Sequence, residues 1–497
     1  MKRILLALTL VLALGISLLP GAASAAAAYS TAFTVSITYQ NVGLDAATVN
    51  VDFFQEGSGT AINFSAGSLN AGASTSLAVG TAITSGSFKG SAVLSSNQPV
   101  IATIVQLDPS GVVRNRPLSN GFSSTDGAAK QLVATVLKNA FDSRSTTYFS
   151  VQNTEASPID VTVKYYAVGA ATEALTDQAN ALPANAAKYF DAGKTSLPDG
   201  FTGSAVVTAK LTGTQTDAKI VVTADELSTI GPGSSSFEGT PLSSDTIYMP
   251  SALCNAFGGQ FTAYAIQNAA QASVSFQVRY KYRPADQPNA NPSEVTDGPY
   301  TIPAGGKQSI AGCNKLPPNS NGSAIVERTG GASNALVAVG KVAGANITSA
   351  FLGIAQGHGS AAIALPYVRW SPDTTINNNG QQRASIAVQN IGTTDATNVK
   401  VQYIDRNGQI MGTQTLGTLS PGAKASSNAK DAGALDACGR FGMYGPNGST
   451  TDCNTVLFGG GAKVIADGGA QLAAVVRIFT GNPILAGEDY NGLNITQ

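Results

Sequence analysis

Apolar and polar residues alternate along most of this chain. In the stretch from Thr147 to Ala167, apolar side chains occupy every second position on both sides of a polar turn at residues 153–158. A period of two is typical of β-strands with one buried face, so the stretch predicts a hairpin. No convincing helical periodicity follows residue 26, and we therefore expect an all-β protein.

The same hairpin pattern occurs four times. A Gln-Asn pair ends the first strand of each copy, and successive Gln residues lie 152 − 40 = 112, 267 − 152 = 115 and 389 − 267 = 122 positions apart. A regular spacing of this size indicates tandem domains rather than a solenoid of short repeats. The pairs are Gln40-Asn41, Gln152-Asn153, Gln267-Asn268 and Gln389-Asn390.

Other landmarks keep their order within each copy. A Val-rich strand follows the Gln-Asn pair, then a short turn such as residues 182–186, a glycine-led strand and a last apolar strand. Short strands separated by turn signals predict four tandem immunoglobulin-like β-sandwiches. We number them units 1 to 4, at residues 26–122, 123–240, 241–355 and 356–497.

The repeated Asn residues predict a structural role rather than a functional one. Asn41, Asn153, Asn268 and Asn390 each lie where a strand ends and a turn begins. An Asn side chain at such a place bonds nearby backbone and tolerates left-handed geometry. The preceding Gln is expected on the outward face of its strand. The glycine that leads the later strand is expected to mark a bulge or a close backbone approach.

The N-terminus predicts a secretory signal peptide over residues 1–25. Lys2 and Arg3 precede an apolar run, which a Pro-Gly break and the small residues 23–25 terminate. No later segment reaches the roughly 18 apolar residues of a membrane span. We therefore expect a protein that is secreted to the cell surface, with no membrane insertion after the leader is cleaved.

Unit 1 has little room for its opening strand. Units 2 to 4 have an extra strand ahead of the hairpin, beginning at Gln131, Thr246 and Ala362. A mature chain starting at residue 26 leaves 40 − 26 = 14 positions before Gln40. Two alternatives stay open: residues 29–34 pair in place, or unit 1 keeps an unpaired edge that another chain completes. Donors for that edge would be the C-terminal stretch or residues 25–30.

Composition excludes several classes of partner. Without Lys2 and Arg3 the chain has 29 − 2 = 27 basic and 30 acidic residues, scattered along its length. A nucleic-acid-binding protein would show a basic stripe, and a lipid-binding one a basic amphipathic helix. Four cysteines in an exported chain predict disulfides, and pairing within units predicts Cys254–Cys313 and Cys438–Cys453. A single His and no close Cys-x-x-Cys disfavour a metal site.

Catalytic signals are weak, and we expect neither an enzyme nor a cofactor. His358, the one histidine, lies in a glycine-rich segment, and no nucleophile elbow is present. Asp405 and Asn407 fit a hairpin turn better than a calcium loop. A sugar-binding surface would have exposed aromatic residues, for which Tyr166 and Trp370 are the weak candidates.

The segment from Val388 carries a family pattern. An Asn-x-Gly turn at residues 390–392 is followed by Val399 and Val401 and then by Leu-x-Pro-Gly at residues 419–422. This segment resembles the cell-adhesion-related β-sandwich modules of bacteria (CARDB-like modules). Unit 1 keeps the Asn-x-Gly turn, whereas units 2 and 3 depart from it. The resemblance implies an immunoglobulin-like fold and a surface location, without implying a ligand.

Together these observations predict a secreted, non-enzymatic structural or adhesive protein of a surface layer, sheath or filament. Its expected partners are copies of itself or other cell-surface components, with polysaccharide as a further possibility. The alternatives are a carbohydrate- or surface-binding module and, less favoured, an extracellular hydrolase.

Overall fold

The computed structural model describes residues 31–495 except 85, 114, 229, 232, 289, 345–346, 373–380, 446–448, 454–455 and 482–485. The predicted signal peptide lies outside this part. The regular structure is almost entirely antiparallel β-sheet, which confirms the all-β prediction. One short α-helix, α2 (Val79–Ala82), occurs in the described part of the chain. Within the same residues, no helix has the length and apolar character that crossing a membrane requires.

Units 1 and 2 each contribute two antiparallel sheets. In unit 1 the strand orders are β4-β1-β6-β7 and β3-β2-β5, and in unit 2 they are β12-β9-β14-β15 and β11-β10-β13-β8. The unit 1 strands are β1 (Thr34–Asn41), β2 (Ala47–Gln55), β3 (Ala61–Leu69), β4 (Ser74–Ala78), β5 (Gly90–Ser96), β6 (Val100–Leu107) and β7 (Leu118–Asn120). Unit 2 has β8 (Lys130–Lys138), β9 (Ser145–Asn153), β10 (Ile159–Ala167), β11 (Glu173–Leu182), β12 (Ala187–Asp191), the 3₁₀ turn η1 (Ala192–Lys194), β13 (Phe201–Leu211), β14 (Ile220–Ser228) and β15 (Ser234–Glu238).

Units 3 and 4 repeat this plan with additions. The unit 3 sheets are β20-β17-β22-β23 and β19-β18-β21-β16-β24, and those of unit 4 are β26-β27-β34-β35 and β29-β28-β33-β25-β36. Unit 3 has β16 (Thr246–Cys254), β17 (Phe261–Asn268), β18 (Val274–Pro284), β19 (Ser293–Ile302), β20 (Lys307–Ala311), η2 (Gly312–Asn314), β21 (Ser320–Gly331), β22 (Leu336–Gly344), β23 (Ile347–Leu352) and β24 (Ile354–Ala355). Unit 4 has β25 (Ala362–Leu365), β26 (Trp370–Ser371), β27 (Gln382–Asn390), β28 (Ala396–Asp405), β29 (Ile410–Leu419), β30 (Lys424–Ser427), β31 (Met443–Tyr444), β32 (Leu457–Phe458), β33 (Gly460–Ile465), β34 (Leu472–Thr480), β35 (Ala486–Asn491) and β36 (Leu493–Asn494).

Each repeated Asn connects two turns of its own unit. The Asn153 amide donates to the carbonyl oxygens of Ser157 at 2.9 Å and Leu182 at 3.0 Å, and its Oδ1 accepts from the Glu155 N–H at 2.8 Å. Asn41, Asn268 and Asn390 make the equivalent bonds. These side chains fix the turn after the first strand against the turn that ends the third.

The glycine that leads the later strand lies directly against its neighbour. A Cβ atom at Gly90, Gly203 or Gly322 would overlap a backbone carbonyl oxygen of the adjacent strand, that of Phe54, Tyr166 or Lys281 respectively. Any larger residue there would separate the two strands. The repeated glycine therefore follows from a close backbone approach.

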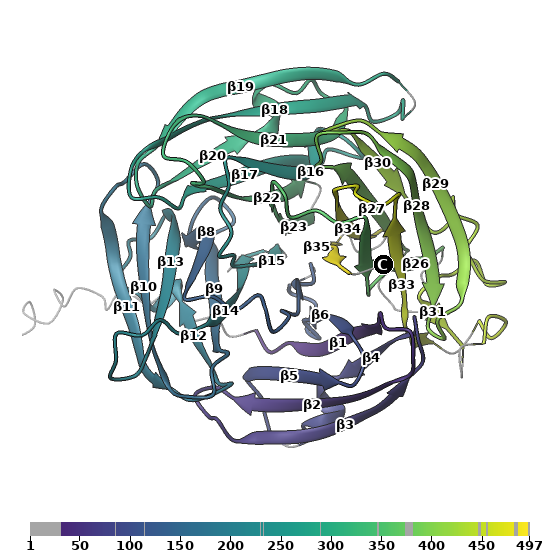
Figure 1. The fold of residues 1–497 in the computed structure, drawn as a ribbon, viewed down its shortest axis with the longest axis horizontal. Coiled ribbons are helices and arrows are strands. Elements are labelled where there is room, and N and C mark those ends of the chain that lie inside the picture. The colour runs from purple at the N-terminus through teal and green to yellow at the C-terminus, as the bar shows by residue number, and fades with distance from the viewer. Residues whose placement is uncertain are drawn as a thin grey trace, which may run out of the picture.

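The units follow one another around a common centre, and the chain closes on itself (Figure 1). Strands β3, β11, β19 and β29 lie at the periphery, and β15, β23 and β35 lie nearest the centre. Unit 4 contacts unit 1 through the Gly460 N–H, which donates to Ser74 Oγ at 2.6 Å, and through Arg116, which pairs with Glu488 at 2.7 Å. Four seams therefore join the units into a ring.

The repeated motifs also build these seams. The serine after the leading glycine donates to a turn carbonyl of the next unit. These bonds are Ser91 to Asn185 at 2.8 Å, Ser204 to Gly305 at 3.0 Å and Ser323 to Gly422 at 2.8 Å. The repeated Gln does lie on the face of its strand away from the core. However, Gln40, Gln267 and Gln389 are buried, because a neighbouring unit covers that face; Gln267, for example, donates to the Ala205 carbonyl of unit 2 at 3.1 Å.

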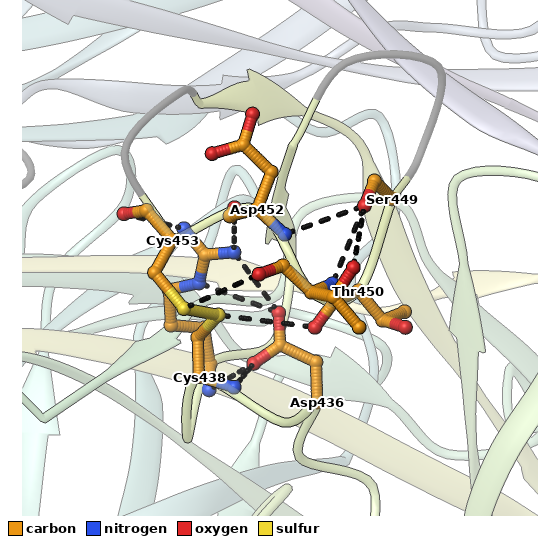
Figure 2. A network of polar contacts seen from close by, with 8 residues as sticks. Asp436, Cys438, Ser449, Thr450, Asp452 and Cys453 are labelled. Carbon is orange, nitrogen blue, oxygen red and sulfur yellow. Dashed lines mark hydrogen bonds and ion pairs between the residues drawn. A yellow bond between two sulfur atoms is a disulfide. The ribbon is translucent and has the colours of Figure 1, made fainter.

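Two disulfides lie in units 3 and 4. Cys254 at the end of β16 pairs with Cys313 in η2, and Cys438 pairs with Cys453 across 15 residues. Figure 2 shows the second bridge beside Asp436, which pairs with the fully buried Arg440 at 3.2 Å. The Arg440 guanidinium also donates to the Asp452 carbonyl at 2.8 Å. Disulfides are compatible with an extracellular protein.

Loss of a bridge should lower stability measurably. Because Cys254 and Cys313 are 59 residues apart, exchanging both for serine is expected to lower the free energy of unfolding by about 4 kcal/mol on the chain-entropy account. The same exchange at Cys438 and Cys453 should cost about 3 kcal/mol, because that loop is shorter. Denaturant titration measures both effects. Non-reducing peptide mapping that linked Cys254 to Cys438 or Cys453 would contradict the assignment.

Candidate functional site at the open edge of unit 1

Units 2 to 4 each complete their second sheet with an opening strand. β8 pairs with β13, β16 with β21 and β25 with β33. β8 also lies against β17 and β22 of the next unit, and β16 lies against β27 and β34. These two strands are therefore covered on both faces, by their own core and by the neighbouring unit.

The second sheet of unit 1 stops at β5. Its order is β3-β2-β5, and no strand of the described residues pairs with the free side of β5. Residues 31–33 are not in a strand, and residues 29–30 of the segment predicted to pair in place lie outside the described part. The Gly90 carbonyl at the start of β5 accepts from Tyr189 Oη of unit 2 at 2.5 Å. Beyond Gly90, β5 offers unpaired N–H and C=O groups to another strand.

The core of unit 1 is less covered beside this edge. Ala92 and Leu94 of β5 and Ala102 and Ile104 of β6 pack against the core but are only partly buried. The residues at the same register in unit 2 are fully buried, namely Ala205, Val207, Val222 and Ala224. In unit 2, β8 is one of the strands that cover these residues. This edge of unit 1 therefore combines partly exposed apolar side chains with an unpaired strand, and we call it the edge groove.

A buried carboxylate of unit 2 lies against β6 of unit 1, the strand whose Ala102 and Ile104 are partly exposed. Asp225 of β14 is 8% exposed and accepts from the Gln106 amide of unit 1 at 2.8 Å through Oδ2. Its Oδ1 has no hydrogen-bond partner among the described residues. Burial raises the pKa of Asp225 above its ordinary value, and interactions with the Gln106 and Ser236 side chains oppose that rise.

The register shows what Asp225 faces. Asp225, Lys341 and Arg477 each pair with the residue five positions before a repeated Asn. Lys341 donates to Thr135 of β8 at 3.1 Å, and Arg477 donates to Ser251 of β16 at 3.4 Å. At these two seams, this position contacts a hydroxyl of the preceding unit's opening strand. Asp225 occupies the corresponding position toward unit 1.

The other seams contain buried ion pairs. Lys341 pairs with Glu226 at 2.5 Å between units 2 and 3, and Arg477 with Asp489 at 2.7 Å beside the seam between units 3 and 4. Lys307 donates to Thr135 at 3.2 Å and Lys424 to Asn321 at 2.6 Å. Burial, together with the positive charge of Lys341 beside Lys307 and of Arg477 beside Lys424, lowers the pKa of both lysines from 10.5 to about 7.

These lysines predict a pH dependence of stability. Between about pH 7 and 10.5 the unfolded chain binds more protons than the folded one, so stability rises with pH in this window. Below about pH 7 the two buried lysines destabilise the folded protein most. Each lysine changes the free energy of unfolding across this window by at most roughly 5 kcal/mol, at about 1.4 kcal/mol per unit of pKa shift. Exchanging Lys307 and Lys424 for methionine should make the thermal unfolding temperature rise less steeply with pH between about pH 7 and 10.5. Lys210→Met, at an exposed position, is the control and should leave the slope unchanged.

An aromatic cluster lies at the seam between units 1 and 2. The Lys89 ammonium is 5.1 Å from the ring centre of Tyr148 and 4.5 Å from that of Tyr189, and the two rings stack at 5.1 Å. Glu56 pairs with Lys89 at 3.0 Å. These residues line an open cleft of about 510 Å³ that Asp177 also borders. Charge and aromatic faces in one cleft are features that sugar-binding sites use.

Other candidates from the sequence lie apart from the groove. His358 is exposed in a turn, where its N–H donates to the Ala355 carbonyl at 3.1 Å. Asp405 accepts from the N–H groups of Asn407 and Gln409, both at 2.8 Å, which closes the hairpin turn between β28 and β29. Tyr166 packs against Gly305 at the next seam. No cluster of potential metal ligands occurs among the described residues.

Comparison with known proteins gives no family. Neither a protein-family model nor a curated protein matches the chain. A solved structure described as "Biofilm associated protein - BSP domain" aligns with 94% of this chain and 91% of its own length, at 8% identity and a TM-score of 0.14. A TM-score this low does not indicate a shared fold. The resemblance to cell-adhesion-related modules stays a prediction.

Proposed function

We propose that the protein is a secreted, non-enzymatic structural component of the cell surface that assembles with copies of itself. The observation that carries this proposal is the partly exposed core of unit 1 beside the unpaired edge of β5. A strand added there would gain main-chain hydrogen bonds from β5 and cover Leu94 and Ile104. Strand addition is therefore the proposed joint between copies.

Two further features support a structural role. Only 12% of the residues are charged, so electrostatic repulsion between copies is small. The ring also connects its units through buried ion pairs and repeated seam bonds, and such a scaffold presents the open edge in a fixed place. The N-terminal leader of the sequence supports export, and the two disulfides fit an oxidising environment.

Self-assembly is tested on the purified mature protein. Light scattering over a range of concentrations should show oligomers that grow with concentration, and negative-stain electron microscopy should show their shape. A protein that stays monomeric at every concentration, with no ordered particles in the micrographs, would overturn the proposal.

The Tyr148–Tyr189 cleft favours polysaccharide binding as a second candidate function. Partly exposed tyrosine rings beside Lys89, Glu56 and Asp177 offer both stacking and hydrogen-bonding groups. Calorimetric titration with soluble polysaccharides tests it. If the candidate holds, Tyr148→Ala should weaken the binding at least tenfold, whereas Tyr300→Ala, far from the cleft in unit 3, should leave it unchanged.

A further inference from the structure

We infer that residues 26–32 of a second copy are the strand that completes unit 1. This inference rests on the proposed self-assembly and names its donor. The segment reads AAAYSTA and would lie along β5, which has seven residues. The donor would occupy the position that β8 and β16 hold in units 2 and 3.

The length of the N-terminal segment decides against donation within one chain. Six residues, 139–144, connect β8 to β9, and six residues, 255–260, connect β16 to β17. Because β1 begins at Thr34, a turn of that length would use residues 28–33. Cleavage after residue 25 would then leave two residues for a strand that has nine in β8. A neighbouring copy needs no such turn, so its whole segment can reach the groove.

The C-terminus is already used in its own chain. β36 pairs with β25, and the Ile495 N–H donates to the Ala362 carbonyl at 3.0 Å. Donation of this stretch to another copy would break those bonds. Of the two donors that the sequence suggests, the N-terminal segment is therefore the one the structure favours.

The chemistry of the segment fits the edge groove. Its alanines are small and apolar, as the partly covered Leu94 and Ile104 require. Its residues Tyr29, Ser30 and Thr31 carry hydroxyl groups, the kind of group that this position contacts at the complete seams. Thr135 and Ser251 bring a hydroxyl to the corresponding position at the complete seams. The segment has no charge to bury beside Asp225.

Cysteine cross-linking between separately purified variants tests the donor. Ala27→Cys and Ala28→Cys sample both faces of the segment, and Val93→Cys marks β5 on the side away from the core. All native cysteines of the described chain are in disulfides, so each variant adds one free thiol. A donor variant is mixed with the Val93→Cys variant and oxidised, and cross-linked peptides are identified by mass spectrometry.

The expected result is a link between residue 27 or 28 of one copy and residue 93 of the other. Ser68→Cys on β3, the opposite edge of the same sheet, is the matched control and should give at least tenfold less product. A mixture that assembles without the link to residue 93 overturns the donor and leaves the proposed function standing. A mixture that does not assemble overturns both.

A variant that lacks residues 26–32 gives an independent measurement. This variant keeps its groove but has no donor segment, so it should not assemble alone. Added to the intact protein, it should accept a donor strand and stop further chain growth. A deletion variant that assembles as well as the parent would overturn the inference. An intramolecular link in a chain carrying both Ala28→Cys and Val93→Cys, formed in place of the intermolecular one, would also overturn it.

Discussion

Exchange of Arg116 for methionine is expected to lower the free energy of unfolding by about 3–5 kcal/mol. Arg116 pairs with Glu488 at 2.7 Å, and the Glu488 side chain is 1% exposed. Burial raises the pKa of Glu488, and Arg116 is the first of the cations that oppose this rise. Without Arg116 the carboxylate must stay charged with fewer partners or take up a proton. Either response weakens the seam between units 4 and 1.

The double variant Arg116→Met with Glu488→Gln is the control for this prediction. It removes both charges, so most of the lost stability should return. Denaturant titration measures the free energies, and hydrogen exchange should locate the first loss of protection in β7 and β35. A single variant less than about 1 kcal/mol below the parent would show that the ion pair does not hold the ring closed.

Proline in β5 is expected to abolish self-assembly. Proline has no N–H and cannot donate to a sheet ladder. Because N–H groups of successive residues point to opposite edges of a strand, one of the variants Ala92→Pro and Val93→Pro removes a bond to the added strand and spares the pairing with β2. That variant should remain monomeric in light scattering while the thermal unfolding of units 2 to 4 is unchanged.

The matched control is Ser65→Pro on β3, the other edge of the same sheet. Edges equivalent to β3 exist in all four units and are not the proposed joint. The Ser65→Pro variant should therefore assemble as the parent does. If both β5 variants assemble normally, the joint lies elsewhere on the ring. If the Ser65 variant alone prevents assembly, the peripheral edge is the joint.

The strands could be predicted from the sequence because their signals are local. Alternation of apolar residues, the repeated Asn and the leading glycine each depend on neighbours within one unit. The ring could not be predicted, because Ser91, Ser204 and Ser323 look like ordinary strand residues. Their role depends on a carbonyl about 100 residues away that the fold brings near. The burial of the repeated Gln was missed for the same reason.

The candidate site could be predicted in part. Counting residues before Gln40 is enough to expect a short first unit. The carboxylate of Asp225 was missed, although a signal was available in the sequence. When the last apolar strands of the units are aligned, positions 225, 341 and 477 are all charged, whereas the matching residue of unit 1 is Val105. A charged residue on a strand that is otherwise buried indicates a contact with another unit, but its partner requires the three-dimensional register.

Among the described residues, an edge that lacks its opening strand occurs once, at β5, and this sets the valence of the proposed joint. In that proposal one copy offers one acceptor edge and one N-terminal donor. Monomers with one acceptor and one donor link into unbranched chains or closed pairs and cannot form a network through this joint alone. Any sheet or mesh built from the protein would therefore need a second, lateral contact, whose strength could vary without changing the length of the chains.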